Sequence, residues 1–229
     1  LAWNDDETRE SAVFRPGLLI ASIRYSLAGT FEGADLELRN AGVSGTHEDG
    51  APYAFQAARM QADTRFVAGS ARGRETFDVA FSADKIDLPP EPAPRLGTRI
   101  ASVRFSARLS ELPPFSTGWR APNRDTLVNY LGESGTTAEI ARLDFDWGQV
   151  SAKGAGKLTL DAANRPTGTL NFTILGIRQL IDALSANDLI DTGGATLPDA
   201  PGGTPVALVL KDGLVTFGPF ALSGLAPLD

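Results

Sequence analysis

The segment Ile100-Ala-Ser-Val-Arg-Phe-Ser-Ala107 shows the pattern that decides the fold of this chain. Val103 and Phe105 alternate with Ser102, Arg104 and Ser106. Successive side chains of a β-strand point to opposite faces, so a period of two predicts a strand with one buried face. The same alternation recurs along the chain, and the clearest further examples are 34–39, 143–147, 157–161 and 169–174. The sequence therefore predicts a mainly β protein.

Turn signals separate these runs and indicate antiparallel pairing. Lys211-Asp-Gly213 lies between two apolar runs and predicts a hairpin, because Asp-Gly favours the backbone of a two-residue turn. Ala163–Pro166 and Asn40-Ala-Gly42 are further predicted turns. We expect either one strongly bent antiparallel sheet or two related β layers.

Helical spacing is scarce. Ile177, Leu180, Ile181 and Leu184 follow the i, i+3, i+4, i+7 pattern, which predicts an amphipathic helix over 177–190. A second short helix is predicted over 125–133.

The proline-rich segment 88–94 is a predicted linker, because proline lacks the amide hydrogen that a strand ladder needs. It divides an N-terminal β layer (1–87) from a C-terminal β layer (95–229) that holds helix 177–190. The match of Ile20-Ala-Ser-Ile-Arg-Tyr-Ser26 to Ile100–Ser106 suggests that the two layers are related. A single continuous domain is the alternative.

Composition excludes several classes of function. The chain has 229 residues, no cysteine and one histidine, His47, which lies in a polar turn. Thiolate chemistry, disulfides and zinc sites with several histidines or cysteines are therefore excluded. The net charge is −7 with no basic cluster, which argues against a nucleic-acid partner. No phosphate-binding loop is present, so we expect no cofactor and no catalytic or metal site.

Two kinds of residue remain as candidates for function. Asp144 and Asp146 share one strand face and are a remote candidate for a carboxylate-dependent hydrolase. Aromatic residues of the middle and later chain either belong to the core or line a groove for an apolar ligand. The candidates for such a groove are Phe115, Trp119, Tyr130, Phe145, Trp147 and Phe172.

The C-terminal two-thirds resembles a known bacterial family. The motifs that carry the likeness are Ala83–Pro90, Ile100–Ser106, Phe145–Val150, Gly156–Asp161, Arg165–Gly168, Leu170–Leu180, Lys211–Gly213, Gly218–Leu222 and Pro227-Leu228. Their order is similar to that of the family catalogued as number 2125 among domains of unknown function. The resemblance covers about residues 75–229.

That resemblance implies a protein of the Gram-negative envelope, in the periplasm or on the periplasmic face of the inner membrane. It implies a hydrophobic N-terminal anchor ahead of this chain and no known reaction. Together with the one-sided strands, it favours a non-catalytic protein that binds or guides a lipid or other apolar ligand along a concave sheet face. A structural module that binds another envelope protein and has a closed core is the alternative.

Overall fold

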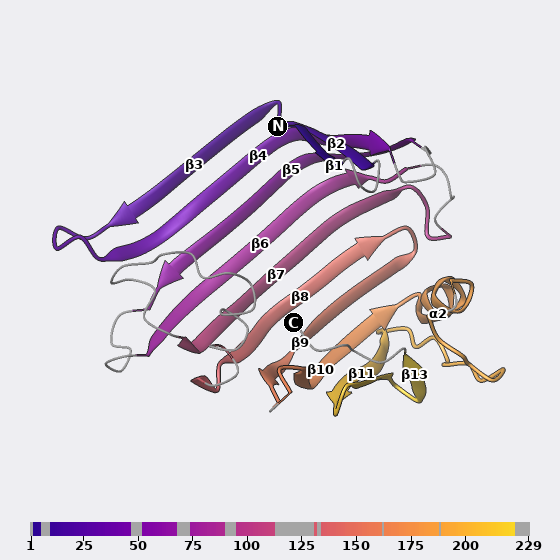
Figure 1. Cartoon of the computed structure of the whole chain (residues 1–229). Helices are drawn as coiled ribbons and strands as arrows, with labels where there is room; N and C mark the ends of the chain where they lie inside the picture. The colour runs from indigo at the N-terminus through magenta and orange to yellow at the C-terminus, as the bar shows by residue number, and fades with distance from the viewer. Residues whose placement is uncertain are drawn as a thin grey trace.

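A computed structural model shows one antiparallel sheet with the helix α2 at its C-terminal end (Figure 1). The described residues are 2–5, 10–46, 52–67, 74–89, 95–112, 131, 134–161, 163–187 and 189–222. The strands are β1 (Ala2–Asp5), β2 (Glu10–Arg15), β3 (Leu18–Tyr25), β4 (Phe31–Thr46), β5 (Pro52–Phe66), β6 (Glu75–Asp87), β7 (Arg99–Leu112), β8 (Thr137–Trp147), β9 (Val150–Leu160), β10 (Pro166–Leu175), β11 (Thr204–Lys211), β12 (Leu214–Phe217) and β13 (Phe220–Leu222). The helix is α2 (Ile177–Ser185).

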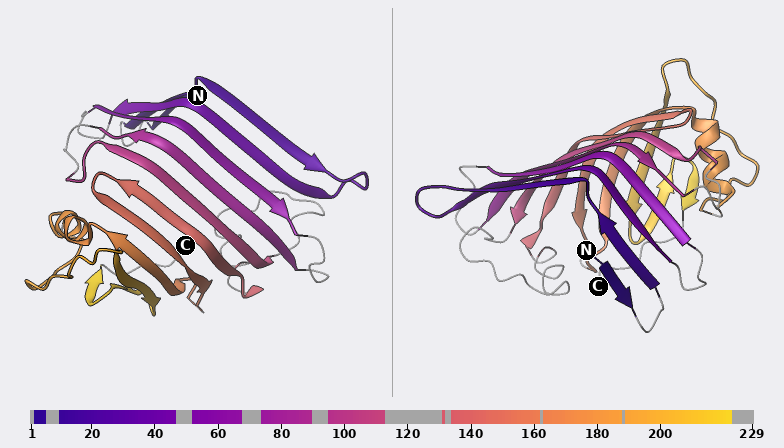
Figure 2. Two further views of the ribbon diagram at one scale, coloured as in Figure 1. Left: turned by 180° about the vertical axis from the view of Figure 1, so that it is seen from behind. Right: turned by 90° about the horizontal axis from the view of Figure 1, so that it is seen from above.

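Strands adjacent in sequence are adjacent in the sheet from β4 to β13. The exception is β4, whose outer edge is shared by two strands: β3 pairs with residues 31–39 and β2 with residues 42–46. The prediction of a mainly antiparallel β protein is confirmed, in the form of one bent sheet (Figure 2).

The proline-rich segment 88–94 joins β6 to β7, and these two strands pair along most of their length. Leu88 donates a backbone hydrogen bond to Thr98 at 2.8 Å, which closes this connection. The sheet is therefore continuous across the segment. The division into two related layers remains a prediction.

The expected hairpin at Lys211-Asp-Gly213 is present, because Lys211 pairs with Leu214. Asp212 and Gly213 both have positive φ angles, as a type I′ turn requires. The turn expected at Asn40-Ala-Gly42 is wrong: β4 continues through it without reversing. Asn40 does adopt a positive φ of 47°, but inside a strand, where it interrupts the ladder instead of ending it.

The helix predicted over 177–190 ends at Ser185. Asn187 donates its side-chain amide to the carbonyl of Ala183 at 2.7 Å, which satisfies one of the last carbonyls of the helix. Ile190 instead forms an isolated bridge with Leu222. Of the helix predicted over 125–133, only Leu131 belongs to the described residues.

A line of irregular positions crosses four strands. Asn40 of β4, Ala58 of β5, Lys85 of β6 and Ala101 of β7 face one another, and the regular pairing skips each of them. Asn40 and Lys85 have positive φ angles of 47° and 50°. Extra or irregular residues of this kind bend a strand and increase its twist. We call this line the crease.

Candidate functional site

The two faces of the sheet differ in chemistry. Direct cross-strand partners lie on the same face, so the register identifies rows of side chains. One row runs across eight strands: Leu36, Ala62, Phe81, Phe105, Leu143, Gly154, Phe172 and Val206. The next row holds Leu38, Met60, Ala83, Val103, Phe145, Ala152 and Ile174. We call the face that carries these two rows the apolar face.

The C-terminal part of the apolar face is covered. Ile177 and Ile181 of α2 are buried against Val150 and Ile174, and Phe220 of β13 belongs to the same cluster. Ile177 is fully buried. The helix and the last strands therefore close over this part of the face and form the main core of the protein.

The N-terminal part is more open within the described residues. Leu36 is 38% exposed, Leu19 is 49% exposed and Ile23 is 61% exposed. Ala62 is also exposed, and Phe81 and Phe105 are half-buried. Leu19 and Ile23 belong to β3, which pairs with no described strand other than β4. Apolar side chains thus lie exposed over β3, β4 and β5.

The opposite face, which we call the charged face, carries ion pairs between neighbouring strands. Arg108 binds Asp78 at 2.8 Å, and Arg59 and Arg39 both bind Glu37. These hydrogen bonds with arginine lower the pKa of Asp78 and of Glu37. Carboxylates that are held in ion pairs on a solvated face contribute little to stability and indicate no reaction by themselves.

Asp35 and Asp63 are an exception on the charged face, because two carboxyl groups are direct cross-strand partners there. Arg24 lies within ion-pair distance of both. The hydrogen bond between the two carboxyl groups raises the pKa of Asp63 and lowers that of Asp35. The two carboxyl groups together therefore keep one proton up to a higher pH than an isolated aspartate would.

The structure describes three of the six predicted groove residues. Phe145 and Phe172 lie on the apolar face and pack against the C-terminal core cluster. Trp147 donates its indole hydrogen to the carbonyl of Gly97 at 2.7 Å. All three side chains are half-buried. The other three, Phe115, Trp119 and Tyr130, lie outside the described residues, as does His47.

Asp144 and Asp146 lie on the charged face. Asp144 accepts a hydrogen bond from Arg142 at 2.6 Å, and Asp146 accepts one from Ser102 at 2.8 Å. Hydrogen bonds from Ser151 and Ser102 lower the pKa of Asp146. A general acid needs a raised pKa instead, so this geometry lends the hydrolase hypothesis no support.

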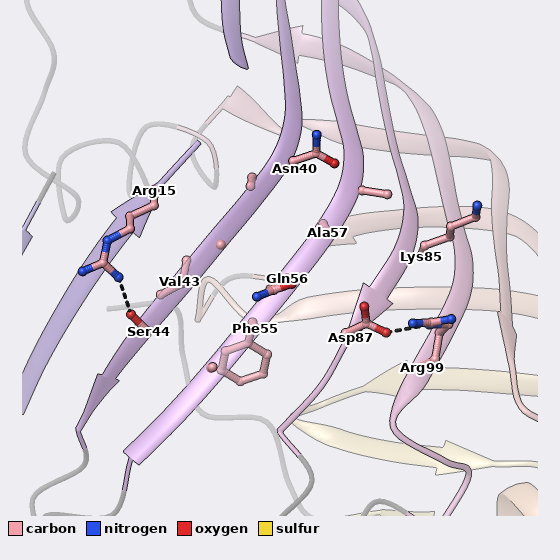
Figure 3. A pocket seen from close by; sticks show the side chains of 14 residues that line it. Arg15, Asn40, Val43, Ser44, Phe55, Gln56, Ala57, Lys85, Asp87 and Arg99 are labelled. Atoms are coloured by element: carbon pink, nitrogen blue, oxygen red, sulfur yellow. Dashed lines mark hydrogen bonds and ion pairs between the residues drawn. The ribbon is translucent and has the colours of Figure 1, made fainter. Parts of the chain in front are cut away.

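A hollow of about 480 Å³ lies at the crease (Figure 3). Its lining includes three cationic side chains, Arg15, Lys85 and Arg99, and one carboxylate, Asp87. Arg99 donates to Asp87 at 2.6 Å and Arg15 donates to Ser44 at 2.9 Å. The lining also includes small residues, among them Gly42, Ala54 and Ala58.

The sequence analysis missed this hollow. Its polar residues come from β2, β4, β5, β6 and β7, and no two of them form a recognisable motif. In the sequence, only Asn40 could have indicated the irregular backbone at the crease, because asparagine tolerates positive φ better than most residues. Lys85 offered none.

Two searches of the described residues gave negative results. No group of three or more histidine, cysteine, aspartate or glutamate side chains in that part of the chain is arranged to hold a metal ion. No helix among the described residues is long and apolar enough to cross a membrane.

Fold and faces together define an open antiparallel β protein with one apolar face and one charged face. The model of a bacterial family, described as "Uncharacterized protein conserved in bacteria (DUF2125)", matches residues 3–226. The chain belongs to this family, which confirms the resemblance and extends it over the N-terminal third. No curated protein and no solved structure matches the chain.

Proposed function

We propose that this protein is a non-catalytic component of the bacterial envelope that binds a lipid or another apolar molecule on its apolar face, on the periplasmic side. The observation that carries the proposal is the row of apolar side chains that continues from the covered core to the exposed positions of Leu36 and Ala62. Exposed apolar surface of this extent is typical of interaction sites. The envelope location rests on what the motifs of the later chain imply.

The size of the expected interaction follows from the area that an acyl chain would bury. Each buried methylene contributes about 0.8 kcal/mol. Ten methylenes therefore contribute roughly 8 kcal/mol before ordering costs, which corresponds to a dissociation constant of micromolar order at best. Such a value suits a protein that must also release its ligand.

The test compares two variants at adjacent positions of β5. Ala62 is exposed on the apolar face, whereas Gln61 lies on the charged face. We expect Ala62→Asp to weaken binding of a fluorescent fatty acid about tenfold, because a charge in contact with the chain must be desolvated. Gln61→Asp adds the same charge one residue away and should leave binding unchanged.

Native mass spectrometry of the purified wild-type chain gives an independent readout, and we expect co-purifying lipid. A protein that carries no lipid and takes up no fatty acid would contradict the proposal. Equal loss of binding in both variants would also contradict it, since the effect would then be independent of the face.

A module that docks another envelope protein is the second candidate, and one observation favours it. Strand β3 exposes Leu18, Leu19 and Ile20 and pairs, among the described residues, with β4 alone. An apolar edge strand is a template for pairing with another strand. Cross-linking at β3 in cells would distinguish a protein partner from a lipid.

A further inference from the structure

The hollow at the crease opens on the charged face. Ser102 of β7 pairs with Asp146, which lies on that face. Ile100 pairs with the next residue, Trp147, so the residue between Ile100 and Ser102 has no partner. Because adjacent strand residues point to opposite faces, Trp147 and Ile100 belong to the apolar face and Arg99 to the charged face. A row of direct partners on the charged face then crosses five strands: Arg99, Asp87, Gln56, Gly42 and Arg15.

The hollow has an excess of positive charge. Asp87 is neutralised by Arg99, which donates to it at 2.6 Å and keeps the pKa of Asp87 low. Arg15 donates to the hydroxyl of Ser44, and Lys85 has no ion pair or side-chain hydrogen bond to any described residue. Arg15 and Lys85 are thus left without a described carboxylate partner, in a chain with a net charge of −7. Elsewhere on the charged face, arginines bind carboxylates of the same face: Arg24, Arg39, Arg59, Arg104, Arg108 and Arg142.

Gly42 keeps the middle of the hollow open. A β-carbon built at Gly42 would make only ordinary contacts, the nearest at 3.7 Å, and the φ angle of this glycine is not positive. The backbone therefore does not require glycine here. Ala54 and Ala58 also line the hollow with short side chains. The resulting volume of about 480 Å³ lies within the range of small-molecule sites, roughly 300–1,000 Å³.

The two cations without a carboxylate lie on opposite sides of the hollow (Figure 3). Arg15 comes from β2 and Lys85 from β6, and β4 and β5 lie between them. Three strand spacings separate β2 from β6, which is about 14 Å between their backbones. Asn40 of β4 and Gln56 of β5 add neutral amide donors between the two cations. The hollow therefore matches a molecule with an anionic group at each end and a polar body.

We propose that the hollow binds a small molecule with two anionic groups, phosphates or carboxylates, one held by Arg15 and the other by Lys85. Charge-assisted hydrogen bonds from arginine and lysine to such groups are stronger than neutral ones. The backbone φ of Lys85 is 50°, which lysine rarely adopts, and strained backbone of this kind gathers at functional sites. The inference goes beyond the proposed function and is independent of it, because the hollow and the apolar face lie on opposite sides of the sheet.

The test measures binding of fructose 1,6-bisphosphate, fructose 6-phosphate and fructose by calorimetry, as probes with two, one and no anionic groups on the same body. We expect the bisphosphate to bind roughly tenfold more tightly than the monophosphate, and fructose not to bind. Lys85→Gln and Arg15→Gln should each weaken bisphosphate binding roughly tenfold. Lys153→Gln is the matched control and should change nothing, because Lys153 is exposed on the charged face but outside the hollow.

Gly42→Leu fills the hollow without changing its charge and should also abolish binding of the bisphosphate. Equal affinities for the bisphosphate and the monophosphate, or no effect of Lys85→Gln, would overturn the inference. Binding to phosphatidylglycerol vesicles that depends on Lys85, without binding of the bisphosphate, would assign the charge to a membrane surface and overturn the small-molecule site. Uptake of the fluorescent fatty acid should be unchanged in every variant, which shows that each is folded, and its absence from the wild-type chain would contradict the proposed function alone.

Discussion

Gly154 shows how one residue shapes the apolar face. It is the direct partner of Phe172 on β10, and a β-carbon built at Gly154 would clash with the edge of the Phe172 ring, two of whose carbons would lie closer than any normal contact. The aromatic ring therefore covers the glycine and fills the space that its missing side chain leaves. Phe172, expected from the sequence to line a groove, thus has a clear packing role.

We expect Gly154→Ala to lower the free energy of unfolding by about 1–3 kcal/mol, because the ring of Phe172 must move out of a packed position. Thermal unfolding followed by circular dichroism measures the change. Ala155→Ser, on the exposed opposite face of the same strand, should change stability by less than about 0.5 kcal/mol. Similar effects of the two substitutions would contradict this role of the ring.

The Asp35–Asp63 pair leads to a prediction about pH. The folded-state pKa of Asp63 is raised, so the pair is favourable while Asp63 holds a proton and becomes repulsive as pH rises through that pKa. Asp63→Asn should therefore raise the melting temperature at pH 7. The gain should shrink as the pH is lowered from 7 through that pKa, because Asp63 of the wild type then becomes protonated.

A gain in melting temperature that stays the same as the pH is lowered from 7 into the acidic range would show that repulsion between the carboxylates is not its source. The control is Asp78→Asn, because Arg108 lowers the pKa of Asp78 in the folded state. That substitution removes a favourable interaction and should lower stability above about pH 4. The two variants should thus have effects of opposite sign at pH 7.

At the level of elements, α2 closes the C-terminal end of the apolar face. Ile177 and Ile181 are buried in the core cluster, whereas Arg178 is exposed and only pairs with Asp199 at 3.4 Å. Ile177→Ala should cost about 2–5 kcal/mol of unfolding free energy, since it removes a fully buried side chain. Arg178→Ala should cost less than about 1 kcal/mol. Denaturant unfolding measures both.

The crease is the second feature at this level. Asn40→Gly should leave stability unchanged or slightly improved, because glycine adopts the φ of 47° without strain. Asn40→Val should cost roughly 1–2 kcal/mol, since a β-branched residue is disfavoured there. If Asn40→Val were as stable as Asn40→Gly, the positive φ at this position would be in doubt.

The sequence predicts much of the architecture of the whole molecule but little of its site. Alternation in segments such as 100–107 predicts the strands, and Asp212-Gly213 predicts a hairpin, because both signals are local. The shared edge of β4 and the crease depend on which distant strands pair, and Asn40-Ala-Gly42 consequently resembled a turn. Lys85 and Arg15 line the same hollow only through that pairing.

The central claim is that the apolar face, and not the charged face, contacts lipid. The most direct measurement places a photo-reactive amino acid at Ala62 or at Gln61 and identifies what each cross-links in bacterial cells. The account predicts lipid adducts from position 62 and none from position 61. Lipid adducts from both positions, or from position 61 alone, would contradict it.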